Sequence, residues 1–239
     1  MAEISKTTDQ ALALLLAIAE RQPVSGAELS RSLRMNRTVT QRLLATLHER
    51  GFVRRDGDDY QIGATALWVA RQAAPSLRAT AAPVMEQLAS RTGETTVLQV
   101  LDGDQLVILD QRIGTRHVVR VEQNLIARHP LHLGASGRVL LAYQPERTIK
   151  RIVSDLPDAE EVTGALDRIR AAGYAISHDE LQWGVHCVAA PVLDAGDTAV
   201  GVLAVLVPVS RAAHSGELVT AVREAAHTVS SDLAAAAGL

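Results

Sequence analysis

The pattern that most constrains this 239-residue chain is a series of helix signals in its first fifty residues. Ser25 is followed three residues later by Glu28, the spacing of a capping box in which each side chain binds the other residue's amide group. Asn36, a favoured N-cap residue, precedes an apolar periodicity of helical type over 37–50. With an amphipathic helix predicted over 9–21, these signals indicate three helices with a tight turn before the third.

A short hairpin is predicted directly after the third helix. Gly51 is placed to end that helix, and residues 52–55 and 60–62 have the composition of two strands joined by a turn at 56–59. Three helices followed by such a hairpin are typical of the winged helix-turn-helix. In that arrangement the N-terminal end of the third helix enters the major groove of DNA.

The charge of this segment is strongly biased, although the whole chain has a formal charge of only −3. Seven arginines lie between Arg31 and Arg55, against the single acidic residue Glu49. Solvated helix faces usually mix both signs, so this bias favours contacts with DNA phosphates. The alternative, a trihelical unit that uses a basic helix to bind protein or to oligomerise, does not require such an excess of arginine.

The exposed face of the third helix supplies the candidate base-reading residues. Val39, Leu43 and Leu47 are spaced four residues apart and are expected to point inward, which leaves the opposite face for DNA. On that face Thr and Gln side chains offer neutral donors and acceptors for base edges, while Arg side chains suit phosphates. The predicted DNA-binding residues are Ser25, Asn36, Arg37, Thr38, Thr40, Gln41, Arg42, Arg54 and Arg55.

The rest of the chain has the pattern of a second domain. We expect a DNA-binding domain over 1–63, a helical linker over 64–76 and a larger domain over 77–239. Strands and helices are segregated in the larger domain, which predicts an α+β fold with an antiparallel sheet and helices on its faces. Strands are predicted over 95–101, 106–113, 117–122, 174–177, 184–193 and 199–207, and helices over 77–91, 138–143, 146–154, 159–172 and 215–237.

Composition limits the chemistry and the location of the protein. The single cysteine, Cys187, excludes a disulfide framework within one chain and favours a reducing compartment. The apolar run at the N-terminus is too short to span a membrane, so a cytoplasmic protein without a membrane partner is expected. We predict no metal and no cofactor. His129 and His132 are separated by Pro130, which breaks a helical ligand pair, and nucleotide-binding motifs are absent.

An enzyme that uses Cys187 and His178 is the competing interpretation. Catalysis by cysteine needs a base within hydrogen-bonding reach of the thiol. The histidine adjacent to the cysteine, His186, is on the same predicted strand, so the two side chains point to opposite faces of the sheet. A buried cysteine is usually an inert apolar side chain. We therefore predict that the protein is not an enzyme and has no catalytic residue.

Three segments resemble the IclR family of bacterial transcription regulators, in order and at compatible spacing. They are AELSRSLRMNRTVTQRLLATLHERGFVRRDGDDYQIG (27–63), HPLHLGASGRVLLA (129–142) and AAGYAISHDELQWGVHCVAAPVLDAGDTAVGVLAV (171–205). The resemblance implies a DNA-binding homodimer, often paired into a tetramer, with a GAF-like C-terminal domain that binds an effector. It also implies control, most often repression, of a catabolic operon by a small organic or aromatic acid.

The resemblance further implies a set of ligand-binding residues in the C-terminal domain. Independently of it, the amide groups of Ala135, Ser136 and Gly137 at the start of a predicted helix offer a site for an anion. The predicted ligand-binding residues are Val121, His129, Ala135, Ser136, Gly137, Ser177, Cys187, Ala204 and Leu206.

Four of these positions differ from the family pattern. Ser177 stands where the family often has an acidic residue, and Ala204 and Leu206 stand where it often has serine. His129 replaces a residue that is often aliphatic. These differences predict a pocket with fewer hydrogen-bonding groups on its floor, suited to an effector that is larger and partly apolar.

Overall fold

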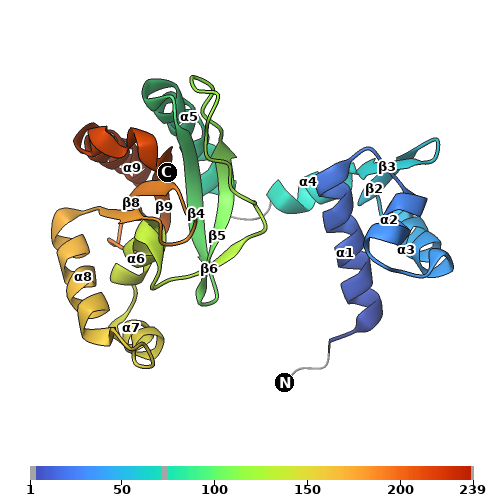
Figure 1. The fold of residues 1–239 in the computed structure, drawn as a ribbon, viewed down its shortest axis with the longest axis horizontal. Coiled ribbons are helices and arrows are strands. Elements are labelled where there is room, and N and C mark those ends of the chain that lie inside the picture. Colours follow the sequence, from blue (N-terminus) through green and yellow to red (C-terminus); the bar gives the residue numbers. More distant parts are fainter. Residues whose placement is uncertain (1–3, 72–74, 238–239) are drawn as a thin grey trace. The chain divides into compact units, whose positions relative to one another are not determined.

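The computed structural model describes residues 4–71 and 75–237, which form two compact units that meet in sequence at residues 75 and 76 (Figure 1). The first unit contains three helices, a three-stranded sheet and a further helix. Its elements are α1 (Lys6–Arg21), β1 (Val24–Ser25), α2 (Gly26–Ser32), α3 (Arg37–Glu49), β2 (Val53–Asp56), β3 (Asp59–Ile62) and α4 (Ala64–Arg71).

The core of the first unit is aliphatic and lies between its helices and the hairpin. Leu14, Ile18, Leu29 and Leu44 are fully buried there, each at 0% exposure. The hairpin formed by β2 and β3 was predicted, whereas the short third strand β1 was not. Val24 of β1 pairs with Tyr60 of β3 and so connects the wing to the segment between the first two helices.

The second unit is built on a six-stranded antiparallel sheet with strand order β6-β5-β4-β9-β8-β7. This is the α+β arrangement that the sequence predicts. Its elements are α5 (Pro75–Thr92), β4 (Thr95–Asp102), β5 (Gln105–Arg112), β6 (Arg128–Pro130), α6 (Gly134–Ala142), α7 (Glu146–Val153), α8 (Ala159–Ala172), β7 (Ala175–His178), β8 (Val185–Leu193), β9 (Ala199–Pro208), the 3-10 helix η1 (Val209–His214) and α9 (Ser215–Ala237).

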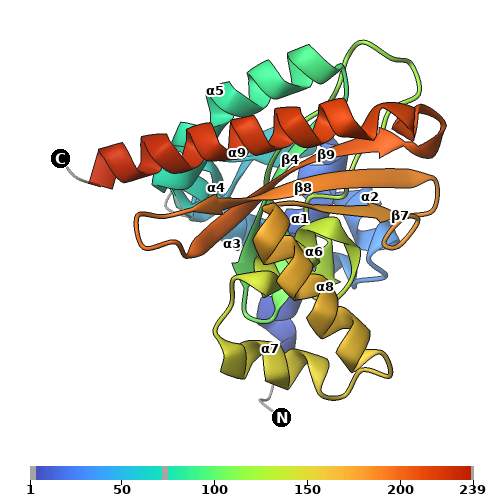
Figure 2. The ribbon, with the colours of Figure 1, turned by 90° about the vertical axis from the view of Figure 1, so that its left-hand side faces the viewer.

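Helices cover both faces of this sheet (Figure 2). Successive side chains of a strand point to opposite faces, so the central strands contribute to two separate cores. On β8, Cys187 and Ala189 pack on the side of α6, α7 and α8, whereas Val188 and Ala190 pack on the side of α5 and α9. A sheet buried on both faces explains why β8 and β9 are almost continuously apolar.

The predicted strand over 117–122 is wrong, because the structure has no regular element there. The segment is instead tied to the sheet by side chains. The Thr95 hydroxyl donates to the Val121 carbonyl oxygen at 2.6 Å, and the Gln111 side-chain oxygen accepts from the Gln123 amide at 3.0 Å. These side-chain bonds replace a backbone ladder, and the edge of the sheet is formed by β6 further along the chain.

The position of Leu203 gives a test of the sheet as the structural core. Leu203 is fully buried on β9, facing the layer that contains α5 and α9. Leu203→Ala is expected to lower the free energy of unfolding by about 2–5 kcal/mol, because it removes buried methyl groups and leaves a cavity. Leu125→Ala, at a leucine that is 55% exposed, is the control and is expected to cost about 0.5 kcal/mol or less in urea denaturation. Equal losses would contradict the packing described.

Candidate DNA interface and effector pocket

The third helix begins as the sequence predicts. The side-chain oxygen of Asn36 accepts a hydrogen bond from the Thr38 amide at 2.9 Å, which caps the N-terminus of α3. Arg37, Thr38, Gln41 and Arg42 are all exposed on this helix. The N-terminal half of α3 therefore presents two cationic and two neutral polar side chains to solvent.

Thr40 is not part of this exposed face, so the expectation that it reads bases is wrong. Its side chain is fully buried, and its hydroxyl donates to the Asn36 carbonyl oxygen at 3.1 Å. A run of residues spaced only by four rotates by about 40° around the helix at each step, so it gradually leaves the buried face. A set at positions i, i+3 and i+4 stays on one face. The buried face of α3 follows the second pattern, through Thr40, Leu43 and Leu44.

Ser25 forms the predicted capping box at the start of α2. The Glu28 amide donates to the Ser25 hydroxyl oxygen at 3.3 Å, and the Ser25 amide donates to the Glu28 carboxylate at 3.0 Å. The Ser25 hydroxyl also donates to the Glu28 carboxylate at 2.7 Å, and this bond, together with the one from the Ser25 amide, holds the pKa of Glu28 below its ordinary value. Ser25 and Asn36 thus both use a side-chain oxygen to fix the start of a helix, Ser25 for α2 and Asn36 for α3.

The wing carries two arginines on β2. The Arg54 guanidinium bonds the Gln61 side chain across the hairpin. Arg55 donates to the Gly57 carbonyl oxygen at 2.7 Å, forms an ion pair with Asp58 at 3.3 Å, and lies 5.9 Å from the centre of the Tyr60 ring. Both side chains remain exposed, but both are oriented by partners within the hairpin.

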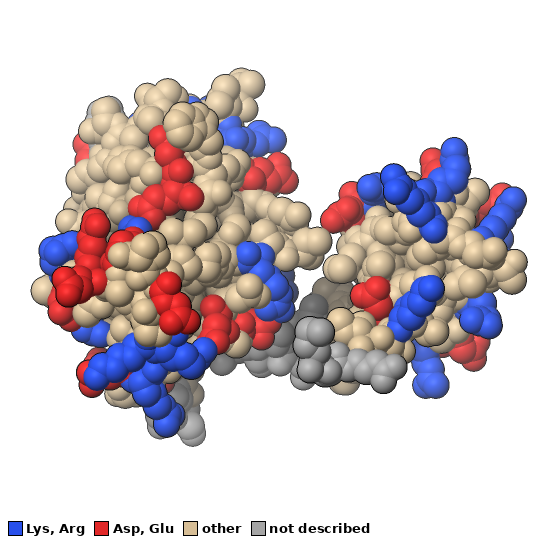
Figure 3. Space-filling model, turned by 60° about the horizontal axis from the view of Figure 1, so that its bottom comes forward, with Lys and Arg blue, Asp and Glu red and all other residues tan. Residues whose placement is uncertain are grey.

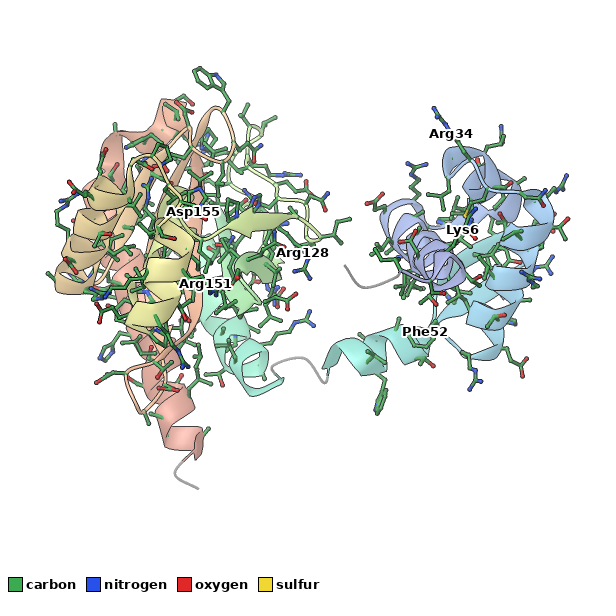
Figure 4. All side chains as sticks on the ribbon, turned by 90° about the horizontal axis from the view of Figure 1, so that it is seen from below. Lys6, Arg34, Phe52, Arg128, Arg151 and Asp155 are labelled. Carbon is green, nitrogen blue, oxygen red and sulfur yellow. The ribbon has the colours of Figure 1, made fainter. Side chains whose placement is uncertain are left out.

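All seven arginines of the basic segment are exposed to solvent. Lys and Arg side chains project from the surface of the first unit in Figure 3. Arg34, in the turn between α2 and α3, points away from the body of that unit (Figure 4). Its φ of 51° is a left-handed conformation, consistent with the tight turn predicted before the third helix.

A small cavity in the second unit brings together five of the predicted ligand-binding residues. Its volume is about 30 Å³, and it lies between the start of α6, the sheet and the loop that joins β7 to β8. The predicted residues in its wall are Ala135, Ser136, Ser177, Cys187 and Leu206.

The other four predicted ligand-binding residues do not line this cavity. Val121 and Ala204 are buried in the same core, at 5% and 0% exposure. Gly137 is packed against backbone, since a Cβ there would stand 2.8 Å from the Leu131 carbonyl oxygen. His129 lies on the edge strand β6, where burial lowers its pKa.

Two amide groups at the start of α6 already have partners within the protein. The Ala135 amide donates to the Ser177 hydroxyl oxygen at 2.9 Å, and the Gly134 amide donates to the Glu180 carboxylate at 3.1 Å. Glu180 also forms an ion pair with Arg138 at 2.7 Å. An effector anion at these amides would have to replace groups of the chain itself.

The sequence prediction missed Gln99 and Glu180, which also line the cavity. Gln99 on β4 is 4% exposed, and its side-chain oxygen has no hydrogen-bond partner among the described residues. The sequence did contain a signal that Gln99 lines a site, because Gln99 is a polar residue at an inward position of an apolar strand. Glu180 is distant from α6 in the sequence, so only the fold reveals that it caps this helix.

Cys187 and His178 are not brought together. The Cys187 sulfur lies 3.8 Å from the Ser136 hydroxyl oxygen, and burial raises the pKa of its thiol to about 11. His178 instead faces His186, with 2.9 Å between their Nδ1 atoms, and His186 Nε2 lies 3.2 Å from the Ser215 hydroxyl oxygen. The thiol therefore stays protonated, and none of the described histidine side chains is bonded to it.

Among the described residues, no group of three or more His, Cys, Asp or Glu side chains converges in a way that could hold a metal ion. None of the helices in the described ranges combines the length and the apolar character that crossing a membrane requires.

Comparison with known proteins identifies both units. The IclR helix-turn-helix domain model matches residues 7–57, and the model described as bacterial transcriptional regulator IclR C-terminal matches residues 73–231. The glycerol operon regulatory protein of Streptomyces griseus is 31% identical, and the match covers 98% of this chain and 99% of that protein.

Solved structures give the same result for the fold. An IclR transcriptional regulator from Alicyclobacillus acidocaldarius is 28% identical and matches with a TM-score of 0.75, over 96% of this chain and 99% of that one. An IclR homologue from Microbacterium hydrocarbonoxydans, crystallised with 4-hydroxybenzoate, matches with a TM-score of 0.78 at 21% identity, over 96% of this chain and 100% of that one. These relatives are regulators and not enzymes, and the chain belongs to the IclR family of bacterial transcriptional regulators.

Proposed function

We propose that this protein is a repressor of a catabolic operon that releases or binds its operator in response to a small organic effector. The observation that carries the proposal is the exposed N-terminal half of α3, with Arg37, Thr38, Gln41 and Arg42, next to a hairpin that holds two more arginines. We place the DNA-binding domain at 1–63, the linker at 64–76 and the effector domain at 77–239. We propose the cytoplasm as its site of action, because a regulator of this kind must reach operator DNA.

The exposed residues of α3 fall into two groups, one suited to DNA phosphates and one suited to base edges. Arginine guanidinium groups neutralise phosphates irrespective of sequence, whereas an exposed glutamine can bond two atoms of an adenine edge in the major groove. Gln41 also lies close to α2, since a Cβ on Gly26 would stand 2.8 Å from its side-chain nitrogen. That contact favours a defined direction for the Gln41 side chain.

The first test of operator recognition compares Gln41→Ala with Arg42→Ala. Gln41→Ala is expected to change the ranking of operator variants by about 1–3 kcal/mol at one base position, because it removes a base contact. Arg42→Ala is expected to weaken binding to all duplexes alike and to reduce the salt slope by about one phosphate contact. Fluorescence anisotropy with a set of single-base operator variants measures both effects.

Lys150→Ala, on α7 of the second unit, is the matched control for loss of a positive charge. It is expected to leave operator affinity and salt slope unchanged. If Gln41→Ala preserves the ranking of operator variants, the assignment of Gln41 as a base-reading residue is contradicted.

Apolar side chains on the first unit support a homodimer as the DNA-binding form. Leu12 and Leu16 on α1 are 55% and 45% exposed, and Leu67, Trp68 and Val69 on α4 are 52%, 64% and 45% exposed. Exposed apolar surface of this kind commonly marks an interface, and a second copy of the chain would supply a second reader for a two-half-site operator.

The dimer is tested by Leu67→Asp. A charge in the proposed interface is expected to shift the protein from dimer to monomer in analytical ultracentrifugation at about micromolar concentration and to weaken operator binding. Leu125→Asp, at an exposed leucine of the second unit, is the control and should leave the mass unchanged. The same measurement distinguishes a dimer from the tetramer that the family resemblance predicts. A monomeric wild-type protein on DNA would contradict the proposal.

We place the effector in the cavity at the start of α6. It is lined by the polar groups of Ser136 and Ser177 and by the apolar surface of Leu206. This combination of a few polar groups with apolar walls is typical of small-molecule sites. The Microbacterium hydrocarbonoxydans homologue with bound 4-hydroxybenzoate supports small-molecule binding by a chain of this fold.

Effector control is tested with Ser136→Val. Ser136 is 3% exposed, and valine at this position removes the hydroxyl and fills the cavity. A thermal-shift screen of organic and aromatic acids first identifies a ligand of the wild-type protein. That ligand is expected to change wild-type operator affinity about 5- to 150-fold and to leave Ser136→Val unaffected, while the variant still binds operator alone. An unchanged response in the variant would place the effector elsewhere.

A further inference from the structure

The cavity at the start of α6 is too small for an organic effector as it stands. Its volume of about 30 Å³ would hold roughly two water molecules. One of its walls must therefore move when a ligand enters. Three lining residues, Glu180, Leu181 and Gln182, belong to the loop 179–184 between β7 and β8, whereas the other walls belong to the sheet, to α6 and to the segment around Gln123.

The loop is held to the rest of the unit by few contacts. The Glu180 carboxylate accepts from the Gly134 amide at 3.1 Å and from Arg138 at 2.7 Å, and Leu181 packs against Gly134. Beyond these contacts the loop is exposed, and Trp183 near its end is 88% exposed. The loop is flanked by left-handed residues, Asp179 at φ 57° and Gly184 at φ 80°. The base of the loop is held separately, since the Gly184 carbonyl oxygen accepts from the Val209 amide at 2.9 Å and the Gly184 amide donates to the Asp179 carboxylate at 2.6 Å. Glu180 is thus the polar attachment of the loop tip, 180–182, to α6.

The Glu180 carboxylate occupies a position that would equally suit the carboxylate of a bound ligand. The first amide groups of a helix lack partners within the helix and attract negative charge. In α6 those of Gly134 and Ala135 are bound by Glu180 and Ser177, beside the guanidinium group of Arg138. A carboxylic acid that enters the cavity meets the same donors and competes with Glu180 for them.

A second, independent feature of the cavity indicates what else the ligand carries. Gln99 is 4% exposed and lines the cavity, and its side-chain oxygen has no partner among the described residues. A buried acceptor without a donor is unfavourable, so a ligand that brings a hydroxyl group gains a hydrogen bond there.

We propose that Glu180 is a displaceable internal ligand of the effector site and that the effector is a small hydroxy acid. Its carboxylate replaces the Glu180 carboxylate at Gly134 and Arg138, and its hydroxyl donates to Gln99. Displacement of Glu180 releases the loop tip, 180–182, from α6, and this movement opens the cavity and changes the conformation of the domain. This inference rests on the proposed function for the location of the site and adds the ligand class and the way in which the site opens. It replaces the larger, partly apolar effector that the sequence predicts, because the cavity is small and contains an acceptor on Gln99 that is unpaired among the described residues.

The first experiment compares Glu180→Ala with Glu160→Ala, which removes an exposed carboxylate from the start of α8. Titration calorimetry uses three probes of similar size: lactate, propanoate and propane-1,2-diol. Glu180→Ala is expected to bind lactate about tenfold more tightly than the wild type, because the internal competitor is gone, and Glu160→Ala is expected to match the wild type. Equal or weaker lactate binding by Glu180→Ala, or no lactate binding by any form, would overturn the proposal.

The role of Gln99 is tested in the Glu180→Ala background. Lactate is expected to bind about tenfold more tightly than propanoate, and Gln99→Leu is expected to remove this preference. Propane-1,2-diol is expected to bind most weakly, because it lacks the carboxylate. Preference for the diol, or a lactate preference that survives Gln99→Leu, would overturn the assignment of the ligand class.

Movement of the loop is measured without relying on affinity. Trp68→Phe leaves Trp183 as the sole tryptophan, so its emission reports on the loop. Lactate is expected to change this emission, and Glu180→Ala is expected to show the change before any ligand is added. Hydrogen exchange in ligand-free protein should be about tenfold faster at 133–136 and 180–184 in Glu180→Ala than in Glu160→Ala. Identical exchange in the two variants would overturn the role of Glu180 in holding the loop.

Operator binding by the same variants separates this inference from the proposed function. If the wild type and both variants bind an operator duplex but Glu180→Ala gains neither lactate affinity nor loop exchange, displacement is overturned and the regulator function stands. If none of the forms binds operator, the proposed function fails whatever the lactate titrations give.

Discussion

The second unit depends on one constraint, the burial of its central strands on both faces. Cys187 packs toward α6 and its neighbour Val188 toward α9, and the same alternation continues along β9. A slip of one residue in register would exchange these two sets of side chains. Because both faces are apolar and densely packed, such a slip would also move Leu206 and Cys187 out of the cavity wall. Register therefore fixes the position of the cavity.

The start of α6 then determines the chemistry of that cavity. A buried helix end must find partners for its amide groups, and here the partners come from β7 and the loop after it. Ser177 is held opposite Cys187 in the ladder between β7 and β8, which places its hydroxyl at the Ala135 amide. Glu180, in the loop after β7, bonds the Gly134 amide at the start of α6 and also forms the ion pair with Arg138.

Local signals in the sequence predicted much of this structure. The capping box at Ser25, the N-cap at Asn36 and the helices 159–172 and 215–237 are where hydrophobic period and capping chemistry place them. These features depend on interactions between residues a few positions apart, so they can be predicted from the sequence alone. The resemblance to the IclR family extended the prediction to the cavity residues, five of which the structure brings together.

One error arose from the geometry of a single helix, and the others arose where distant residues decide the outcome. Thr40 is small enough to be buried, and its hydroxyl is satisfied by the Asn36 carbonyl oxygen within its own helix, so its polarity did not predict exposure. Residues 117–122 have the composition of a strand, but side chains of β4 and β5 fix that segment without a ladder. Glu180 caps α6 from 46 positions away in the sequence, a contact that no local pattern contains.

The central claim, that the basic helix-turn-helix unit reads DNA, is tested most directly by a salt titration of operator binding. Affinity for a duplex from the region upstream of its own gene is measured between about 50 and 200 mM salt. Each phosphate contact contributes a slope of about −0.9 in log K against log salt, so several arginine contacts predict a steep fall. A steep slope together with preference over an unrelated duplex is the predicted result. An affinity that does not change with salt, or no binding to any duplex, would contradict the account.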